Sequence, residues 1–152
     1  MKASMRIYLD VCCLNRPFDD QAQDRVRLET EAIKSILLRI GTRQWIGVSS
    51  EVVLLEISRM VESERQLDVG LLASQMPEFV TVDEPTKQRA QDLEKLGFHA
   101  VDALHIACAE KSRVDVLLTT DDHMLKKYKQ YARRMGVLVA NPLTWIEGVV
   151  RL

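Results

Sequence analysis

The stretch IYLDVCCLNRPF, residues 7–18, is the starting point for the fold that we predict. Apolar side chains at Ile7, Leu9 and Val11 alternate in the pattern of a β-strand, and the Asn-Arg-Pro sequence that follows predicts a turn. An ionisable side chain, Asp10, lies near the end of this strand. Because aspartate is uncommon in strands, we expect a functional reason for its position.

Helices and strands alternate along the rest of the chain. Apolar residues at helical spacing, helped by capping serine and asparagine and by prolines in first turns, predict helices at 26–40, 52–60, 66–73, 85–97, 100–110 and 123–134 and from 142 onward. Short apolar runs predict strands at 45–49, 79–82, 114–120 and 137–140. This alternation predicts an α/β fold, with three α/β/α layers and a mainly parallel central sheet. We find no linker or internal repeat and expect residues 1–152 to form a single domain.

The composition excludes several classes of protein. Hydrophobic residues make up 47% of the 152 residues, and the net charge of -1 excludes a polycationic chain that binds nucleic acid by bulk charge alone. No apolar run approaches the roughly 18 residues that a membrane span needs. The three cysteines form neither a disulfide framework nor the CxxC spacing of a zinc site. We therefore expect a soluble, cytoplasmic protein with no membrane partner.

Four acidic residues stand out by their positions. Parallel sheets bind ligands beyond the carboxyl ends of their strands, and Asp10 and Asp121 both lie at such ends. Asp102 lies in the first turn of the helix that contains ALHIACA, and Glu56 lies among apolar residues of another helix. Three of them also have a structural interpretation: Asp102 as a helix-dipole partner, Asp121 as an N-cap and Glu56 as a solvated side chain.

The order of these motifs closely resembles that of the PIN domain family. The matching stretches are LDVCCLN near the start, a glutamate at position 56 in an apolar helix, DALHIACA in the middle and LLTTDDHML late in the chain. PIN domains are metal-dependent nucleases, and many are VapC-like ribonuclease toxins of bacterial toxin–antitoxin pairs. The resemblance implies that the catalytic and metal-binding residues are the family's four acids, Asp10, Glu56, Asp102 and Asp121.

Residues beside these acids extend the resemblance or depart from it. Thr119 matches a threonine that supports the family's site by hydrogen bonding, and Asp122 is a candidate to lie just outside the metal ligands. Cys12 stands where the family commonly has a small polar residue. We expect the Cys12 side chain to be packed in the interior.

A set of carboxylates suits a hard divalent cation. Carboxylates held close together repel one another, so their pKa values rise unless a cation neutralises the charge. Oxygen ligands favour Mg²⁺ or Mn²⁺, whereas zinc would call for histidine or cysteine at suitable spacing. Such a cation activates water for attack on a phosphodiester. The predicted function is an Mg²⁺- or Mn²⁺-dependent endoribonuclease that hydrolyses single-stranded RNA.

Local positive charge near the acids is a candidate RNA-binding surface. Arg16 follows the first strand, and Lys126 and Lys127 lie on the helix after Asp121. Together they can hold phosphates that flank the cut, although a solvated helix face explains each lysine equally well.

The three histidines carry less information. His105 follows Asp102 by one helical turn, so the two can share a face of the helix. We favour a packed or capping role for His105 over a catalytic one. His99 and His123 are isolated in the sequence and are assigned no role.

Other functions and partners stay open. The main alternative is a catalytically silent PIN-like module that binds protein or RNA, against which the presence of all four acids argues. A haloacid-dehalogenase-like phosphatase needs an aspartate where Cys12 stands, and a receiver domain needs its acid pair after the first strand. We expect a homodimer and an antitoxin partner. The apolar helix at 52–61 is either a surface for one of them or part of the core.

Overall fold

The computed structural model describes residues 4–150 and contains one five-stranded sheet, in the order β3-β2-β1-β4-β5. All neighbouring strands are parallel. The strands are β1 (Arg6–Leu9), β2 (Ile46–Ser50), β3 (Glu78–Val80), β4 (Val116–Leu118) and β5 (Leu138–Ala140). The predicted α/β fold with a parallel central sheet is therefore confirmed.

Burial on both faces explains the apolar sequence of the central strands. Tyr8 pairs with Leu117 in the register between β1 and β4, and both side chains are fully buried. Strands covered on both faces consist of continuous apolar runs, because neither face meets water. The chain order changes between β1 and β4, and this junction is where a parallel sheet places its ligands.

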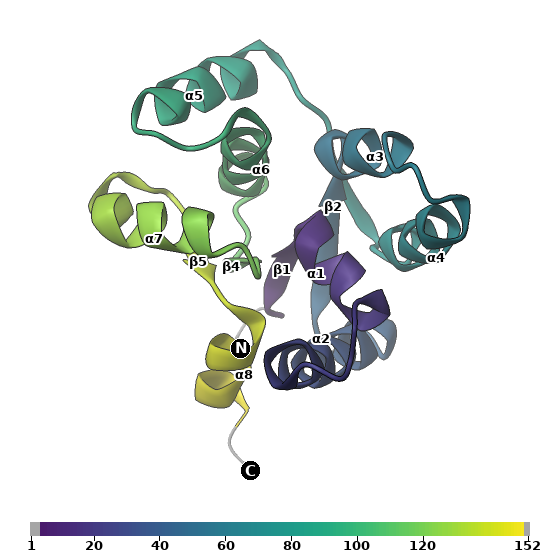
Figure 1. Cartoon of the computed structure of the whole chain (residues 1–152). Helices are drawn as coiled ribbons and strands as arrows, with labels where there is room; N and C mark the ends of the chain where they lie inside the picture. The colour runs from purple at the N-terminus through teal and green to yellow at the C-terminus, as the bar shows by residue number, and fades with distance from the viewer. Residues whose placement is uncertain (1–3, 151–152) are drawn as a thin grey trace.

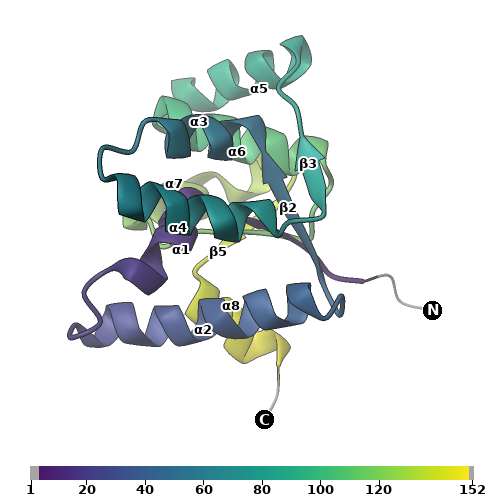
Figure 2. The same ribbon diagram turned by 90° about the vertical axis from the view of Figure 1, so that its right-hand side faces the viewer.

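Helices cover both sides of the sheet. The helices are α1 (Val11–Asn15), α2 (Asp24–Gly41), α3 (Glu51–Ser58), α4 (Ser63–Ser74), α5 (Glu84–Lys95), α6 (Ala100–Lys111), α7 (Asp122–Tyr131) and α8 (Pro142–Val149). Figure 1 shows α5, α6 and α7 on one side of the sheet and α2 with α8 on the other. In the view turned by 90°, α3 and α4 lie beside β2 (Figure 2). The predicted three layers are thus present.

Side-chain caps fix where five of the helices begin. The capping residues, whose side chains accept backbone N–H groups of the first turn, are Asp10, Ser50, Asp83, Asp121 and Asn141. Each such cap stabilises a helix by about 1 kcal/mol. Two of the acids singled out in the sequence therefore also define helix starts.

The segment after Asp10 differs from the prediction. We expected the strand to run through Val11 to an Asn-Arg-Pro turn, but β1 ends at Leu9 and α1 begins at Val11, followed by the 3₁₀ turn η1 (Arg16–Phe18). The Asp10 Oδ1 atom accepts the Cys13 N–H at 3.0 Å and so starts the helix. The apolar run Val-Cys-Cys-Leu suits a buried strand and a buried helix alike, and the cap decides between them.

The remaining helix boundaries differ by small amounts. Helix α4 begins at Ser63 rather than at residue 66, and α7 ends at Tyr131, after which the chain continues in a second 3₁₀ turn, η2 (Ala132–Arg134). Within residues 4–150, every helix is too short or too polar to cross a lipid bilayer.

Candidate metal centre

Two aspartates occupy the carboxyl edge of the sheet beside the strand-order change. The backbone N–H of Asp10 donates to the Leu118 carbonyl at 3.3 Å, which joins the end of β1 to the end of β4. The Asp121 Oδ1 atom accepts the N–H groups of His123 and Met124 at 2.8 and 3.1 Å. These bonds hold each carboxylate at the start of its helix.

A third aspartate reaches the same place from another helix. Asp102 lies in the first turn of α6, and its carboxylate, that of Asp121 and a ring nitrogen of His123 all lie within 4.8 Å of one another. Partial burial, followed by the negative charges of Asp121 and Asp10, raises the pKa of Asp102 to about 6. A neighbouring cation would relieve this repulsion.

Asp10 is the most enclosed of the acids, with only 2% of its surface exposed. Burial raises the pKa of Asp10, and His105, the Thr119 hydroxyl and the Cys13 N–H act in the opposite direction. The Thr119 Oγ1 atom also accepts the Asp121 N–H at 3.1 Å. The buried Thr119 therefore lies between the two aspartates at the sheet edge.

Glu56 approaches from α3 and is held by a buried hydrogen-bond chain. Its carboxylate is hydrogen-bonded to His105 Nε2, and His105 Nδ1 is 2.6 Å from the Tyr8 hydroxyl. The same hydroxyl is 2.6 Å from Ser50 Oγ. Burial raises the pKa of Tyr8, so its hydroxyl stays protonated and can donate to Nδ1. This places the His105 proton on Nε2, where it is donated to Glu56.

His105 agrees with the packed interpretation. It is 1% exposed, and each of its ring nitrogens has a hydrogen-bond partner. Its contact with Glu56 nevertheless links the core to the acids. The sequence shows only the shared helix face with Asp102, because Tyr8 and Glu56 come from distant parts of the chain.

Cys12 lies among all four acids and is exposed, which corrects the expectation of a packed side chain. The pKa of its thiol is raised by loss of solvent and then by the charges of Asp10, Asp121, Glu56 and Asp102. The short helix α1 causes this exposure, because it turns Cys13 inward and Cys12 outward. The four predicted acids therefore share one electrostatic environment.

A cleft of about 470 Å³ opens beside Asp121. Its lining is formed by Cys12, Asn15, Arg16, Asp19, Arg65, Thr120 and Asp121. Arg65 comes from α4, and its guanidinium donates to Asp19 at 2.9 Å and to Asn15 at 3.2 Å. No sequence pattern points to Arg65, because α4 carries none of the four acids and approaches them only in the folded chain.

The predicted phosphate-binding residues are placed differently from one another. Arg16 lines the cleft but forms ion pairs with Asp19 at 3.2 Å and with the buried Glu29 at 3.0 Å. Lys126 is exposed on α7. The Lys127 side chain lies against Gly97, where a Cβ atom would stand 2.8 Å from Nζ.

Asp122 points to a different partner from its neighbour Asp121. Its two carboxylate oxygens accept from the Arg25 guanidinium at 2.8 Å each, and this interaction lowers the pKa of Asp122. Arg25 also donates to the Thr120 carbonyl at 3.0 Å. The pairing ties α7 to α2 at the rim of the cleft.

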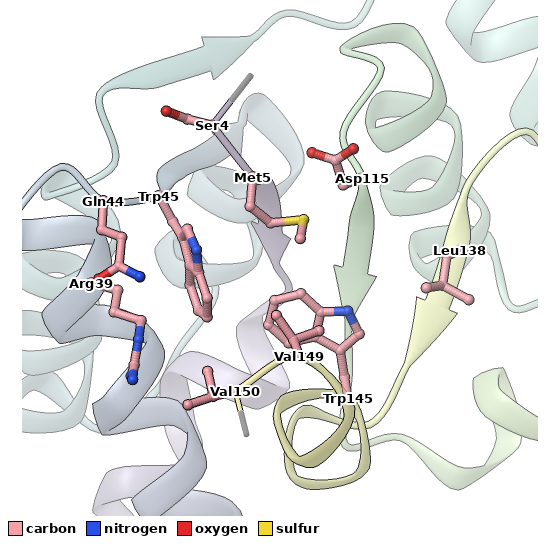
Figure 3. A pocket seen from close by; sticks show the side chains of 10 residues that line it. All are labelled: Ser4, Met5, Arg39, Gln44, Trp45, Asp115, Leu138, Trp145, Val149 and Val150. Atoms are coloured by element: carbon pink, nitrogen blue, oxygen red, sulfur yellow. The ribbon is translucent and has the colours of Figure 1, made fainter. Parts of the chain in front are cut away.

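A larger cavity lies at the opposite edge of the sheet. It has a volume of about 830 Å³ and is lined by residues at the starts of strands, including Met5, Asp115 and Leu138 (Figure 3). Asp115 is the single carboxylate among the lining residues, and it accepts the backbone N–H of Arg6. The smaller cleft, which Asp121 and Cys12 line, is therefore the candidate site.

The donor set at this cleft suits a divalent cation. Carboxylates from the ends of β1 and β4 and from α6 repel one another, and two of them have raised pKa values. Oxygen donors of this kind bind Mg²⁺ or Mn²⁺. The residues that fit such a cation are Asp102 and Asp121, with Asp10 and Glu56 beside them.

Comparisons with known proteins identify a family and similar folds. The sequence profile of the PIN domain matches residues 7–130. The crystal structure of VapBC2 from Rickettsia felis, bound to a DNA fragment from their promoter, contains a chain with a TM-score of 0.58 and 16% identity, over 90% of this chain and 98% of that one. FitAcB from Neisseria gonorrhoeae gives a TM-score of 0.55 and 15% identity, over 90% and 97%. Curated protein sequences give no significant match.

Proposed function

The chain belongs to the PIN domain family, as its motifs predicted, and we propose that it is a cytoplasmic, metal-dependent endoribonuclease that hydrolyses single-stranded RNA. The main support is that acids from separate elements gather at the strand-order change of a parallel sheet. Carboxylate oxygens of Asp102 and Asp121 lie within 4.8 Å of each other, and the charges of Asp10 and Glu56 act with theirs on the Cys12 thiol. Aspartates that only cap helices need not lie this close together, and a bound cation would relieve their repulsion.

In the proposed mechanism, Asp10, Asp102 and Asp121 hold Mg²⁺ or Mn²⁺, and Glu56 ligates it or orients the attacking water. When bound, the cation lowers the pKa of water and stabilises charge on the leaving oxygen. The carboxylate of Glu56 is fixed on one side by His105, so its free oxygen can accept a proton from the water. Hydrolysis then proceeds without a covalent enzyme intermediate.

Basic residues around the cleft are the proposed contacts to RNA. Arg16 lines the cleft itself, and the α7 lysines Lys126 and Lys127 follow Asp121 by little more than one helical turn. They would neutralise phosphates on either side of the cut. A single strand can bend its backbone into a recessed acidic site more readily than a duplex can, which favours single-stranded RNA.

We also propose that the protein is the toxin of a toxin–antitoxin pair. The family includes VapC-like toxins, and the two solved structures described above are named VapBC2 and FitAcB. The predicted apolar helix at 52–61 divides into two faces: Val52, Val53 and Ile57 are buried, whereas Leu54 and Leu55 are exposed. This exposed face supports an antitoxin or a second copy as partner.

The test exploits the double role of the aspartates. In Asp10→Asn and Asp121→Asn, the side-chain oxygen can still cap the helix, because asparagine caps as well as aspartate, but the negative charge is lost. We expect cleavage of a labelled single-stranded RNA with Mn²⁺ to fall roughly 100-fold or more, as when other charge-stabilising groups are removed. EDTA should abolish cleavage by the wild-type protein.

Asp20→Asn is the matched control. Asp20 is exposed, and its Oδ1 atom accepts the Ala22 N–H, a bond that asparagine can retain. Cleavage by this variant should equal that of the wild type. Full activity in both Asp10→Asn and Asp121→Asn, or cleavage in EDTA, would exclude the mechanism. Binding of RNA with no cleavage under any cation would favour the catalytically silent module.

A further inference from the structure

His123 contributes a nitrogen atom to the group of carboxylates. It lies in the first turn of α7, directly after the cap formed by Asp121, and a ring nitrogen is within 4.8 Å of the carboxylate oxygens of Asp102 and Asp121. The Nδ1 atom is buried and has no hydrogen-bond partner among residues 4–150. Buried ring nitrogens are normally partnered, so this one is available for a ligand.

The ring of His123 is held in place without using its nitrogens. His99, at the start of α6, stacks on it with the two ring centroids 4.1 Å apart and the planes 21° from parallel. Stacking fixes the plane of the imidazole and leaves its edge, which carries both nitrogens, facing other groups.

His105 shows the contrasting case. One of its nitrogens is hydrogen-bonded to Tyr8 and the other to Glu56, so it has no nitrogen left for a metal ion. While these two hydrogen bonds are intact, His105 cannot supply a nitrogen ligand to the metal ion. His123 is therefore the histidine whose ring nitrogen can join the carboxylates as a ligand.

We propose that His123 is a ligand of the divalent cation, together with Asp102 and Asp121, and that it makes the site prefer a transition-metal ion such as Mn²⁺ over Mg²⁺. Imidazole binds first-row transition metals well, whereas Mg²⁺ favours oxygen ligands and water. The inference rests on the proposed metal centre and adds a nitrogen ligand to it. It differs from the prediction from sequence, in which the ligands are oxygen atoms alone.

The test is pulsed electron paramagnetic resonance of the protein loaded with Mn²⁺. Wild type should show nitrogen hyperfine coupling from one imidazole, and His123→Gln should lose it. We expect Mn²⁺ affinity, measured by titration, to fall about tenfold or more in His123→Gln, by comparison with the 10- to 100-fold losses for groups that support metal ligands. The affinity for Mg²⁺ should change much less.

The matched control is His99→Phe, which keeps an aromatic ring to stack on His123 and removes only the ring nitrogens of residue 99; the nitrogen coupling should persist. Mn²⁺ binding without nitrogen coupling in the wild type would overturn the role of His123 and leave the carboxylate centre standing. Coupling that persists in His123→Gln would overturn it as well. Failure of the wild type to bind Mn²⁺ at all would overturn both this inference and the metal-dependent function.

Discussion

Two halves of the candidate site differ in how far folding alone completes them. The paired half, defined as Tyr8, Ser50, His105 and Glu56, is a continuous chain of hydrogen bonds that begins in the core. The open half, defined as Asp102, Asp121 and His123, places charged and polar atoms close together without direct bonds among their side chains.

The difference shows which part of the site needs a ligand. In the paired half every buried polar group has a partner, so its geometry is set before substrate or metal arrives. In the open half, partial burial and then repulsion by Asp121 and Asp10 raise the pKa of Asp102 to about 6, and the repulsion persists until a cation binds. We therefore expect the paired half to contribute to stability and the open half to ligand binding.

The largest effect on stability should come from His105→Ala. The substitution leaves a cavity and removes the partner of the buried Tyr8 hydroxyl, so we expect a loss of about 3 kcal/mol in the free energy of unfolding. The same change at His123, in the open half, should cost less than about 0.5 kcal/mol, as is usual away from the core. Urea denaturation of both variants without metal measures the two values. Equal losses would remove the distinction between the halves.

Metal binding should give the next largest effect and should act through the open half. A cation that binds only the folded protein, at 100 times its dissociation constant, stabilises it by about 2.7 kcal/mol. We expect added Mn²⁺ to raise the melting temperature of the wild type and EDTA to reverse the increase. Asp121→Asn should lose most of this response. An unchanged response in that variant would place the cation elsewhere.

Tyr8→Phe should have a smaller effect, confined to the paired half. The change removes one hydroxyl that bridges Ser50 and His105, so we expect a loss of about 1–2 kcal/mol in the free energy of unfolding. The hydrogen-bond partners of the Tyr8 hydroxyl, Ser50 and His105, both belong to the paired half. The Mn²⁺-induced rise in the melting temperature of Tyr8→Phe should therefore match that of the wild type. A lost Mn²⁺ response would show that the two halves are coupled.

The smallest effect should come from Arg25→Gln at the rim. Arg25 pairs with the exposed Asp122, and exposed ion pairs contribute no more than about 1 kcal/mol to stability. Arg25 also pairs with the buried Glu29 at 3.3 Å, but Glu29 keeps Arg16 as a second partner in the variant. Titration of this variant with Mn²⁺ measures whether Asp122, released from Arg25, contributes to metal binding. We expect the affinity of the variant for Mn²⁺ to equal that of the wild type. A clear increase would assign Asp122 to the metal centre after all.

Sequence patterns predict those parts of the site that follow from sheet topology. Asp10 and Asp121 are candidates because strand ends in a parallel sheet meet at one edge, and Asp102 because helix starts are readable from sequence. Glu56 was found through its place in the motif order. Its orientation toward His105 depends on how α3 packs on α6, and no local pattern encodes that.

The remaining parts depend on contacts between distant segments. Helix α1 was not predicted because a four-residue apolar run does not distinguish a strand from a helix. The wrong expectation that Cys12 is packed in the interior followed from that error. His123 is isolated in the sequence because its neighbours in the fold, Asp102 and His99, lie at the start of α6. The whole of α6 and then β4 separate them from His123 along the chain. Arg65 enters the cleft from α4 for the same reason.

The strand order has a consequence for synthesis of the protein. The first strand to be made, β1, lies at the centre of the sheet, and its second neighbour, β4, is made only after six further helices. A chain emerging from the ribosome can pair β1 with β2 early, but it cannot bring Asp10 beside Asp121 until the chain through the start of α7 is outside. The candidate metal centre therefore cannot assemble on a chain that is interrupted before α7, even though such a chain already carries Asp10, Glu56 and Asp102.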